Sequence, residues 1–224
     1  MKRVAIFLSI FTSFLIALNN DKPNFKNLNF RFIGPDGNRA IAISGVSSDH
    51  NTYYVGAASG GLFKTTNKGI SWEPIFDDQD VSSVSAIAVS QKNPNIVWAG
   101  TGETFLIRPA HAIGDGIYKS EDGGNTWKNM GLQKTARIAK IVIHPKNDKI
   151  VYVAALGHTF GPQEDRGIYK TTDGGKTWKK ILFIDQNTGG IDIALDRKNP
   201  NFLIASMWEI YINTWGLNSG GESG

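Results

Sequence analysis

The stretch Ser-Glu-Asp-Gly-Gly-Asn-Thr-Trp at residues 120–127 decides the fold. It returns at residues 171–178 as Thr-Thr-Asp-Gly-Gly-Lys-Thr-Trp, and in a looser form at residues 65–72 as Thr-Thr-Asn-Lys-Gly-Ile-Ser-Trp. In this pattern Asp can accept turn amides, Gly tolerates a positive φ, and Trp can fill the space between strands. We therefore expect three hairpins of one construction, with structural roles for Asn67, Gly69, Trp72, Asp122, Gly124, Trp127, Asp173, Gly175 and Trp178.

Each hairpin closes a longer repeat. Ahead of it lie an alternating apolar segment, a polar turn such as Lys-Asn-Pro-Asn at 92–95, and a nearly continuous apolar segment. The Trp residues that end successive hairpins, Trp72, Trp127 and Trp178, are 55 and 51 residues apart, enough for four strands and one long connection. The continuous apolar segments suit strands buried on both faces. We expect an all-β β-propeller of four-stranded antiparallel blades at about 39–84, 85–137, 138–189 and 190–224, the last incomplete.

The eight-residue pattern is the Asp box, and the chain resembles the sortilin/VPS10-like, BNR/Asp-box repeat β-propeller superfamily. Its secreted bacterial members are often labelled glycosyl hydrolase-like. The resemblance is strongest at 56–66, 143–145 and 152–158. It implies a propeller of seven to ten blades in a longer protein, and no established reaction. With about three and a half blades present, we expect the chain alone to expose strand edges and to be unstable or aggregate.

The first 20 residues have the layout of a secretory signal peptide. Lys2 and Arg3 precede an apolar run that ends near Leu18. An uncleaved signal anchor is the alternative, although the run is short for a bilayer about 30 Å thick. Residues 21–38 form an N-terminal segment, in which 28–34 could be a strand that closes the ring. We expect export to the periplasm, the cell surface or the medium.

Composition excludes several classes of protein. The formal net charge is +4 with dispersed charges, so we expect no nucleic-acid partner and no membrane contact beyond the signal segment. The chain has no cysteine, so packing and strand pairing alone must hold the fold. We expect no cofactor and no metal, because one Asp followed by two glycines gives too few oxygen ligands for calcium.

Chemistry is expected on the connections between the second and third strands, which vary most in length. Long insertions on one face of a repeat protein are where binding is usually placed. The candidate ligand-binding residues there are Glu103, Arg108, His111, His158, Arg166 and Trp208. The candidates for catalysis are Glu103 and Glu164.

The main functional hypothesis is an exported binding or scaffold module that recognises a protein, peptide or glycan, with no catalysis evident. The alternative is a glycoside hydrolase with catalytic carboxylates partly outside this chain, and assembly or chaperone work is a third possibility. A glycosidase requires two carboxyl groups about 5 to 10 Å apart across a groove. The sequence contains neither a His-Glu-x-x-His zinc motif nor a Gly-x-Ser-x-Gly elbow, so nothing indicates a peptidase.

Overall fold

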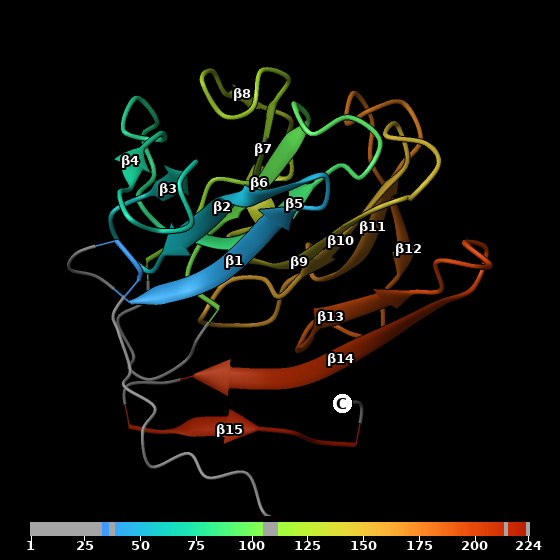
Figure 1. Ribbon diagram of the computed structural model, residues 1–224. Coiled ribbons are helices and arrows are strands. Elements are labelled where there is room, and N and C mark those ends of the chain that lie inside the picture. Colours follow the sequence, from blue (N-terminus) through green and yellow to red (C-terminus); the bar gives the residue numbers. More distant parts are fainter. Residues whose placement is uncertain (1–32, 36–38, 105–111, 213–214, 223–224) are drawn as a thin grey trace, which may run out of the picture. The chain divides into compact units, whose positions relative to one another are not determined.

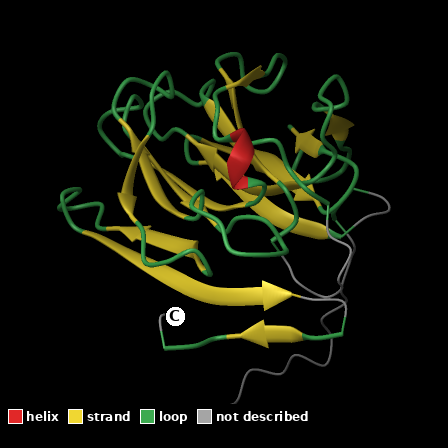
Figure 2. Cartoon of the chain, turned by 180° about the vertical axis from the view of Figure 1, so that it is seen from behind, coloured by secondary structure: helices red, strands yellow, loops and turns green. Residues whose placement is uncertain are grey.

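The computed structural model describes residues 33–35, 39–104, 112–212 and 215–222, which belong to one compact unit, Ile33–Gly224. This described part consists of β-strands and loops, with one short 3-10 helix at Gln133–Thr135 (Figure 2). The all-β prediction is confirmed.

The strands form four sheets that follow one another along the chain (Figure 1). The first contains β1 (Ala40–Val46), β2 (Asp49–Ala57), β3 (Leu62–Thr65) and β4 (Glu73–Pro74). The second contains β5 (Val84–Val89), β6 (Val97–Thr101), β7 (Ile117–Ser120) and β8 (Lys128–Asn129). The third contains β9 (Ile138–Ile143), β10 (Val151–Ala155), β11 (Gly167–Thr171) and β12 (Lys179–Leu182). The fourth contains β13 (Thr188–Leu195), β14 (Leu203–Ile212) and β15 (Leu217–Ser219).

All four sheets pair in the same way. Consecutive strands are antiparallel neighbours, so each sheet is a meander. The pairing of the first two strands skips one residue at the equivalent place in every sheet: between Ala40 and Ala42, Val84 and Ala86, Ile138 and Lys140, and Gly190 and Asp192. A bulge at one fixed position bends each sheet alike, which makes the four sheets copies of one unit.

The core lies between neighbouring sheets. In β6, Trp98 packs in a cluster with the third sheet, whereas Val97 and Ala99 pack in a cluster with the first. Because side chains alternate along a strand, a strand sandwiched between two sheets needs apolar residues at every position. The continuous apolar segments of the sequence have this cause.

The first strands of the four sheets line a common cavity of about 410 Å³. The fourth sheet departs from the others at its second strand, because β15 pairs only with Ile210–Ile212 at the end of β14. The earlier part of β14 pairs on its β13 side. Phe202, just before β14, and Ile204, within it, are 56% and 57% exposed. The apolar residues that would face a further blade are therefore open to solvent in the described part of this sheet.

Candidate functional site

Each blade has two chemically different ends. One end carries the turn between the first two strands and the hairpin between the last two, and we call it the Asp-box end. A backbone bond joins the two in each of the first three blades, since Lys68, Gly123 and Gly174 donate to the carbonyls of Asn51, Asn95 and Lys149 respectively. The opposite end carries the connections between the second and third strands, and we call it the loop end.

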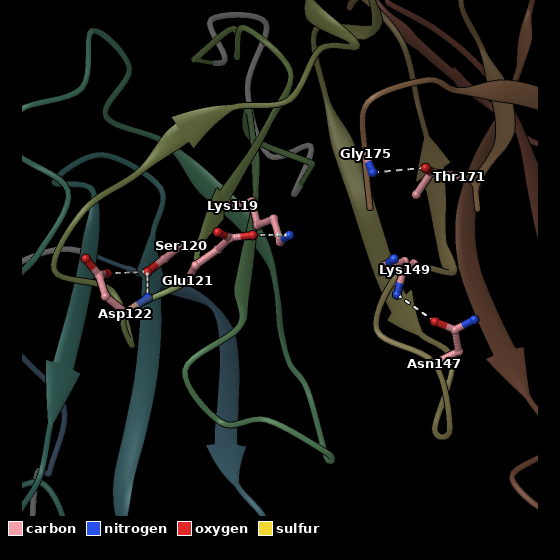
Figure 3. Close-up of polar contacts among 8 residues, drawn as sticks. All are labelled: Lys119, Ser120, Glu121, Asp122, Asn147, Lys149, Thr171 and Gly175. Atoms are coloured by element: carbon pink, nitrogen blue, oxygen red, sulfur yellow. Dashed lines mark hydrogen bonds and ion pairs between the residues drawn. The ribbon is translucent and has the colours of Figure 1, made fainter. Parts of the chain in front are cut away.

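The carboxylates of the Asp-box end are committed to their own hairpins. Asp122 accepts the Ser120 hydroxyl at 2.7 Å (Figure 3). It also accepts the Thr126 amide at 2.9 Å and the Thr126 hydroxyl at 2.6 Å. Asp173 makes the same bonds to Thr177 and Thr171. The hydrogen bonds from Thr126 and Ser120 lower the pKa of Asp122 to about 2, and those from Thr177 and Thr171 hold the pKa of Asp173 lower still. These contacts describe a structural group, not a reacting one.

In the first hairpin the side-chain amide of Asn67 takes the place of the Asp carboxylate. Asn67 Oδ1 accepts the Ser71 amide at 3.0 Å, and Asn67 Nδ2 donates to the Ser71 hydroxyl at 2.9 Å. In all three hairpins the leading Ser or Thr hydroxyl accepts the amide of the last Gly, Gly69, Gly124 or Gly175.

The Trp of each hairpin ties it to the segment that precedes its blade. Trp127 Nε1 donates to the Ile75 carbonyl at 2.7 Å, just after β4, and Trp178 Nε1 donates to the Met130 carbonyl at 2.8 Å, just after β8. The Asp box therefore closes its own blade and also fastens it to the previous one.

At the loop end, Glu103 is buried and forms an ion pair with Arg39. Its backbone amide donates to the Ala112 carbonyl at 2.8 Å, which joins the two ends of the second blade's connection. Arg108 and His111, predicted in that connection, lie outside the described residues. The carboxylate of Glu103 thus holds the start of the first blade against the second.

The third blade's connection is held by two buried arginines. Arg137 donates to the carbonyls of Gly157 at 2.6 Å and His158 at 2.8 Å. Arg166 donates to the carbonyls of Asn187 at 2.9 Å and His158 at 3.3 Å. Burial, with the nearby Arg166 charge, lowers the pKa of Arg137 to about 10, and burial also lowers the pKa of Arg166.

The other predicted residues are distributed over different loops. His158 and Glu164 are exposed on the third blade's connection, and Trp208 is half-buried in β14 with its indole donating to the Ser219 hydroxyl at 3.0 Å. The structure brings Arg166 onto the backbone of His158, but Glu103 belongs to another blade. Sequence reasoning missed Arg39 and Arg137. A basic residue directly before the first strand of a blade was the available signal.

Neither a metal cluster nor a membrane-spanning helix occurs among the residues that the structure describes. No group of three or more His, Asp or Glu side chains in those ranges could hold an ion. No helix there is long and apolar enough to cross a bilayer.

Comparisons with known proteins connect this geometry to a family. The model of the Sortilin-Vps10 family (sortilin, neurotensin receptor 3) matches residues 115–216. Vacuolar protein sorting/targeting protein 10 of Kluyveromyces lactis is 33% identical over 79 residues, 35% of this chain. The crystal structure of an ancestral GH74 enzyme superposes with a TM-score of 0.59 at 24% identity, over 81% of this chain and 23% of that one. The chain is a β-propeller that is similar to the Sortilin-Vps10 family.

A further relative of this sortilin/Vps10-like propeller is a probable oligoxyloglucan-reducing end-specific xyloglucanase of Neosartorya fischeri. It is 26% identical over 153 residues, 65% of this chain. The chain spans 16% of that protein's length and 5% of the Kluyveromyces lactis protein's length. The predicted propeller class is confirmed, while the number of blades stays a prediction.

Proposed function

We propose that this propeller is a binding module that recognises a protein, peptide or glycan through the connections at its loop end. The observation that supports it is the pair of buried arginines that fixes the third blade's connection at the His158 carbonyl. A binding residue works best when its backbone is held in place before the ligand arrives. The exposed His158 side chain satisfies that condition.

The surroundings of the two candidate catalytic residues, Glu103 and Glu164, favour a binding function over hydrolysis. Glu103 is buried and its carboxylate is paired with Arg39, so it joins two blades and is not open to a ligand. Glu164 is exposed on the connection of the next blade, and its backbone carbonyl accepts the Lys180 ammonium. A glycosidase needs one carboxyl group able to protonate the leaving oxygen and a second opposite it.

The test is a glycan array and a peptide array probed with the full-length exported protein that contains this chain, with hydrolysis assays run in parallel. We expect binding without turnover, lost in His158→Ala and retained in Glu164→Gln. Binding that survives His158→Ala contradicts the loop-end assignment. Turnover that disappears in Glu103→Gln or Glu164→Gln replaces the proposal with a glycoside hydrolase.

We also propose that residues 1–20 direct export and that the segment before Ile33 supplies the outer strand of a ring-closing blade. Trp72 Nε1 donates to the Ile33 carbonyl at 2.8 Å, as Trp127 and Trp178 donate to Ile75 and Met130. Ile75 and Met130 each directly follow the fourth strand of a blade, so Ile33 occupies the corresponding position ahead of the first blade. Residues 28–32 lie outside the described ranges.

N-terminal sequencing of the exported protein tests the first part, with a new terminus near residue 21 expected. For the second part, Trp72→Phe should loosen the N-terminal segment, measured as faster proteolysis before Ile33, and Trp127→Phe should not. Equal proteolysis in both variants contradicts ring closure by this segment.

A further inference from the structure

A groove of about 480 Å³ runs between the Asp-box ends of the second and third blades. It lies at the opposite end of the blades from the proposed ligand loops. From the second blade come Lys119, Glu121, Thr126, Trp127, Lys128 and Met130, and from the third come Lys149, Asp173, Gly174 and Lys176. Its volume is within the range of about 300–1,000 Å³ that is typical of small-ligand sites.

Four lysines and two carboxylates line this groove, and only some of them form hydrogen bonds or ion pairs. Lys119 donates to Glu121 at 2.6 Å (Figure 3). Asp173 is bonded within its own hairpin. The side chains of Lys128, Lys149 and Lys176 are exposed, and none of their ammonium groups has a hydrogen bond or ion pair with another described residue. Three exposed ammonium groups without a direct hydrogen bond or ion pair therefore line one cavity, which holds more cations than carboxylates.

The same surface between the first and second blades shows that the fold does not require these lysines. Gly123 donates to the Asn95 carbonyl as Gly174 donates to that of Lys149, so Asn95 and Lys149 are equivalent. The residue after the Trp is Glu73 in the first blade and Lys128 in the second. Asn125 lies two residues before Trp127, as Lys176 lies two before Trp178.

Glu, Asn and Asn thus occupy the positions that Lys128, Lys149 and Lys176 occupy one blade later, within the same hydrogen-bonded frame. Like charges held close together repel one another, so the three lysines gain nothing from each other in the unliganded fold. A ligand with several negative charges would be attracted to all three ammonium groups and would offset the repulsion between them.

The groove offers donors and few acceptors. Each ammonium group has three N–H donors, whereas the groove carboxylates Glu121 and Asp173 already accept bonds. The backbone groups at its rim are used as well, since the amides of Gly174 and Thr126 both have acceptors. The cations of the groove outnumber its carboxylates, which favours a ligand that carries several anionic oxygens. A sugar acid, with carboxylate, hydroxyl and ring oxygens, matches such a surface.

We propose that this groove binds an acidic oligosaccharide, with Lys128, Lys149 and Lys176 contacting its carboxylates and Trp127 forming an apolar wall. Lysine acts as a point charge on a flexible stem, which suits a chain of repeated carboxylates better than one fixed carboxylate. Binding should weaken steeply with added salt, because the charges are exposed.

The test is titration calorimetry of the full-length exported protein that contains this propeller with the trimer of galacturonic acid, and with the neutral trimer of galactose as the uncharged match. In the variant Lys128→Glu/Lys149→Asn/Lys176→Asn each position takes the residue of the equivalent surface, so the fold has already accepted it. We expect affinity for the acidic trimer to fall about tenfold or more, as expected from losing three exposed charge pairs.

The control variant Lys92→Asn/Lys134→Glu/Lys198→Asn changes the net charge equally at exposed positions outside the groove, and it should bind like the unchanged chain. The reciprocal variant Glu73→Lys/Asn95→Lys/Asn125→Lys should gain a second site. Equal loss in the groove and control variants overturns the proposal, because net charge alone would then explain binding. Tighter binding of hexaglutamate than of the acidic trimer overturns it too, in favour of an acidic peptide.

Discussion

The Asp-box ends and the loop ends of the blades are built on opposite principles. At the Asp-box ends the same side chains make the same short-range bonds in three hairpins, as Ser120 to Asp122 and Thr171 to Asp173 do. At the loop ends each blade has its own solution: an ion pair between Arg39 and Glu103 in one place, and Arg137 on two carbonyls in another. Repetition preserves the backbone hydrogen bonds of the Asp-box ends, whereas at the loop ends each blade holds its connection by different bonds.

The largest effect is expected where the Asp-box frame touches the neighbouring blade. Gly175 has a φ of 94°, and an added Cβ would lie 2.6 Å from Trp98 Cη2 in the core between blades. Gly175→Ala therefore combines backbone strain with overpacking, and we expect the free energy of unfolding to fall by about 3 kcal/mol. Urea unfolding followed by tryptophan fluorescence measures it.

Gly174→Ala is the matched control for this substitution. Gly174 has a φ of 78°, but the nearest atom to its added Cβ would be Lys119 Nζ at 3.8 Å. Only the backbone term remains, about 1 kcal/mol. An equal fall in the free energy of unfolding in the two variants would show that the contact with Trp98 adds no cost to the substitution.

A middle-sized effect is expected at the loop end. Arg137→Met removes the donors to the Gly157 and His158 carbonyls, although His158 keeps its bond from Arg166. Leaving buried acceptors without donors should cost about 2 kcal/mol. Hydrogen exchange should rise in residues 157–166 and stay unchanged in the hairpin at 171–178, which separates the two ends of one blade.

Arg39→Met is the matched change two blades earlier. Arg39 and Arg137 both precede a first strand, and their carbonyls accept the amides of Ala58 and Leu156. The Arg39 side chain is 49% exposed, so its loss should cost less than that of Arg137. If Arg39→Met lowered the free energy of unfolding more than Arg137→Met, the ion pair between Arg39 and Glu103 would contribute more stability than the bonds of Arg137.

The contrast between the two ends also explains what the sequence could predict. The hairpins were predictable because Asp122 and Thr126 are four residues apart, so the pattern is visible in a short window. The link between Arg137 and Gly157 spans 20 residues and ends on a carbonyl, which every residue has. Glu103 was predicted to contact ligand and was found paired with Arg39, 64 positions away. No local pattern marks such partners.

The smallest effect separates the hairpins from one another through pH. The pKa of Asp122 is about 2 in the fold, against 3.8 for an ordinary Asp, because the hydroxyl and amide of Thr126 bind the charged form. A lowered pKa contributes stability that is complete above about 4 and is lost as pH falls toward 2. Asp173 follows the same direction at lower pH, whereas Asn67 has no charge to lose.

Amide exchange followed by NMR from pH 5 to pH 2 should therefore show the Thr126 amide opening before that of Thr177, with the Ser71 amide least affected. Asp122→Asn should remove the acid response at Thr126 while keeping an acceptor there, as Asn67 does. If all three amides opened together, the hairpins would titrate through global unfolding, and the local bonds that make the Asp-box ends alike would not act independently.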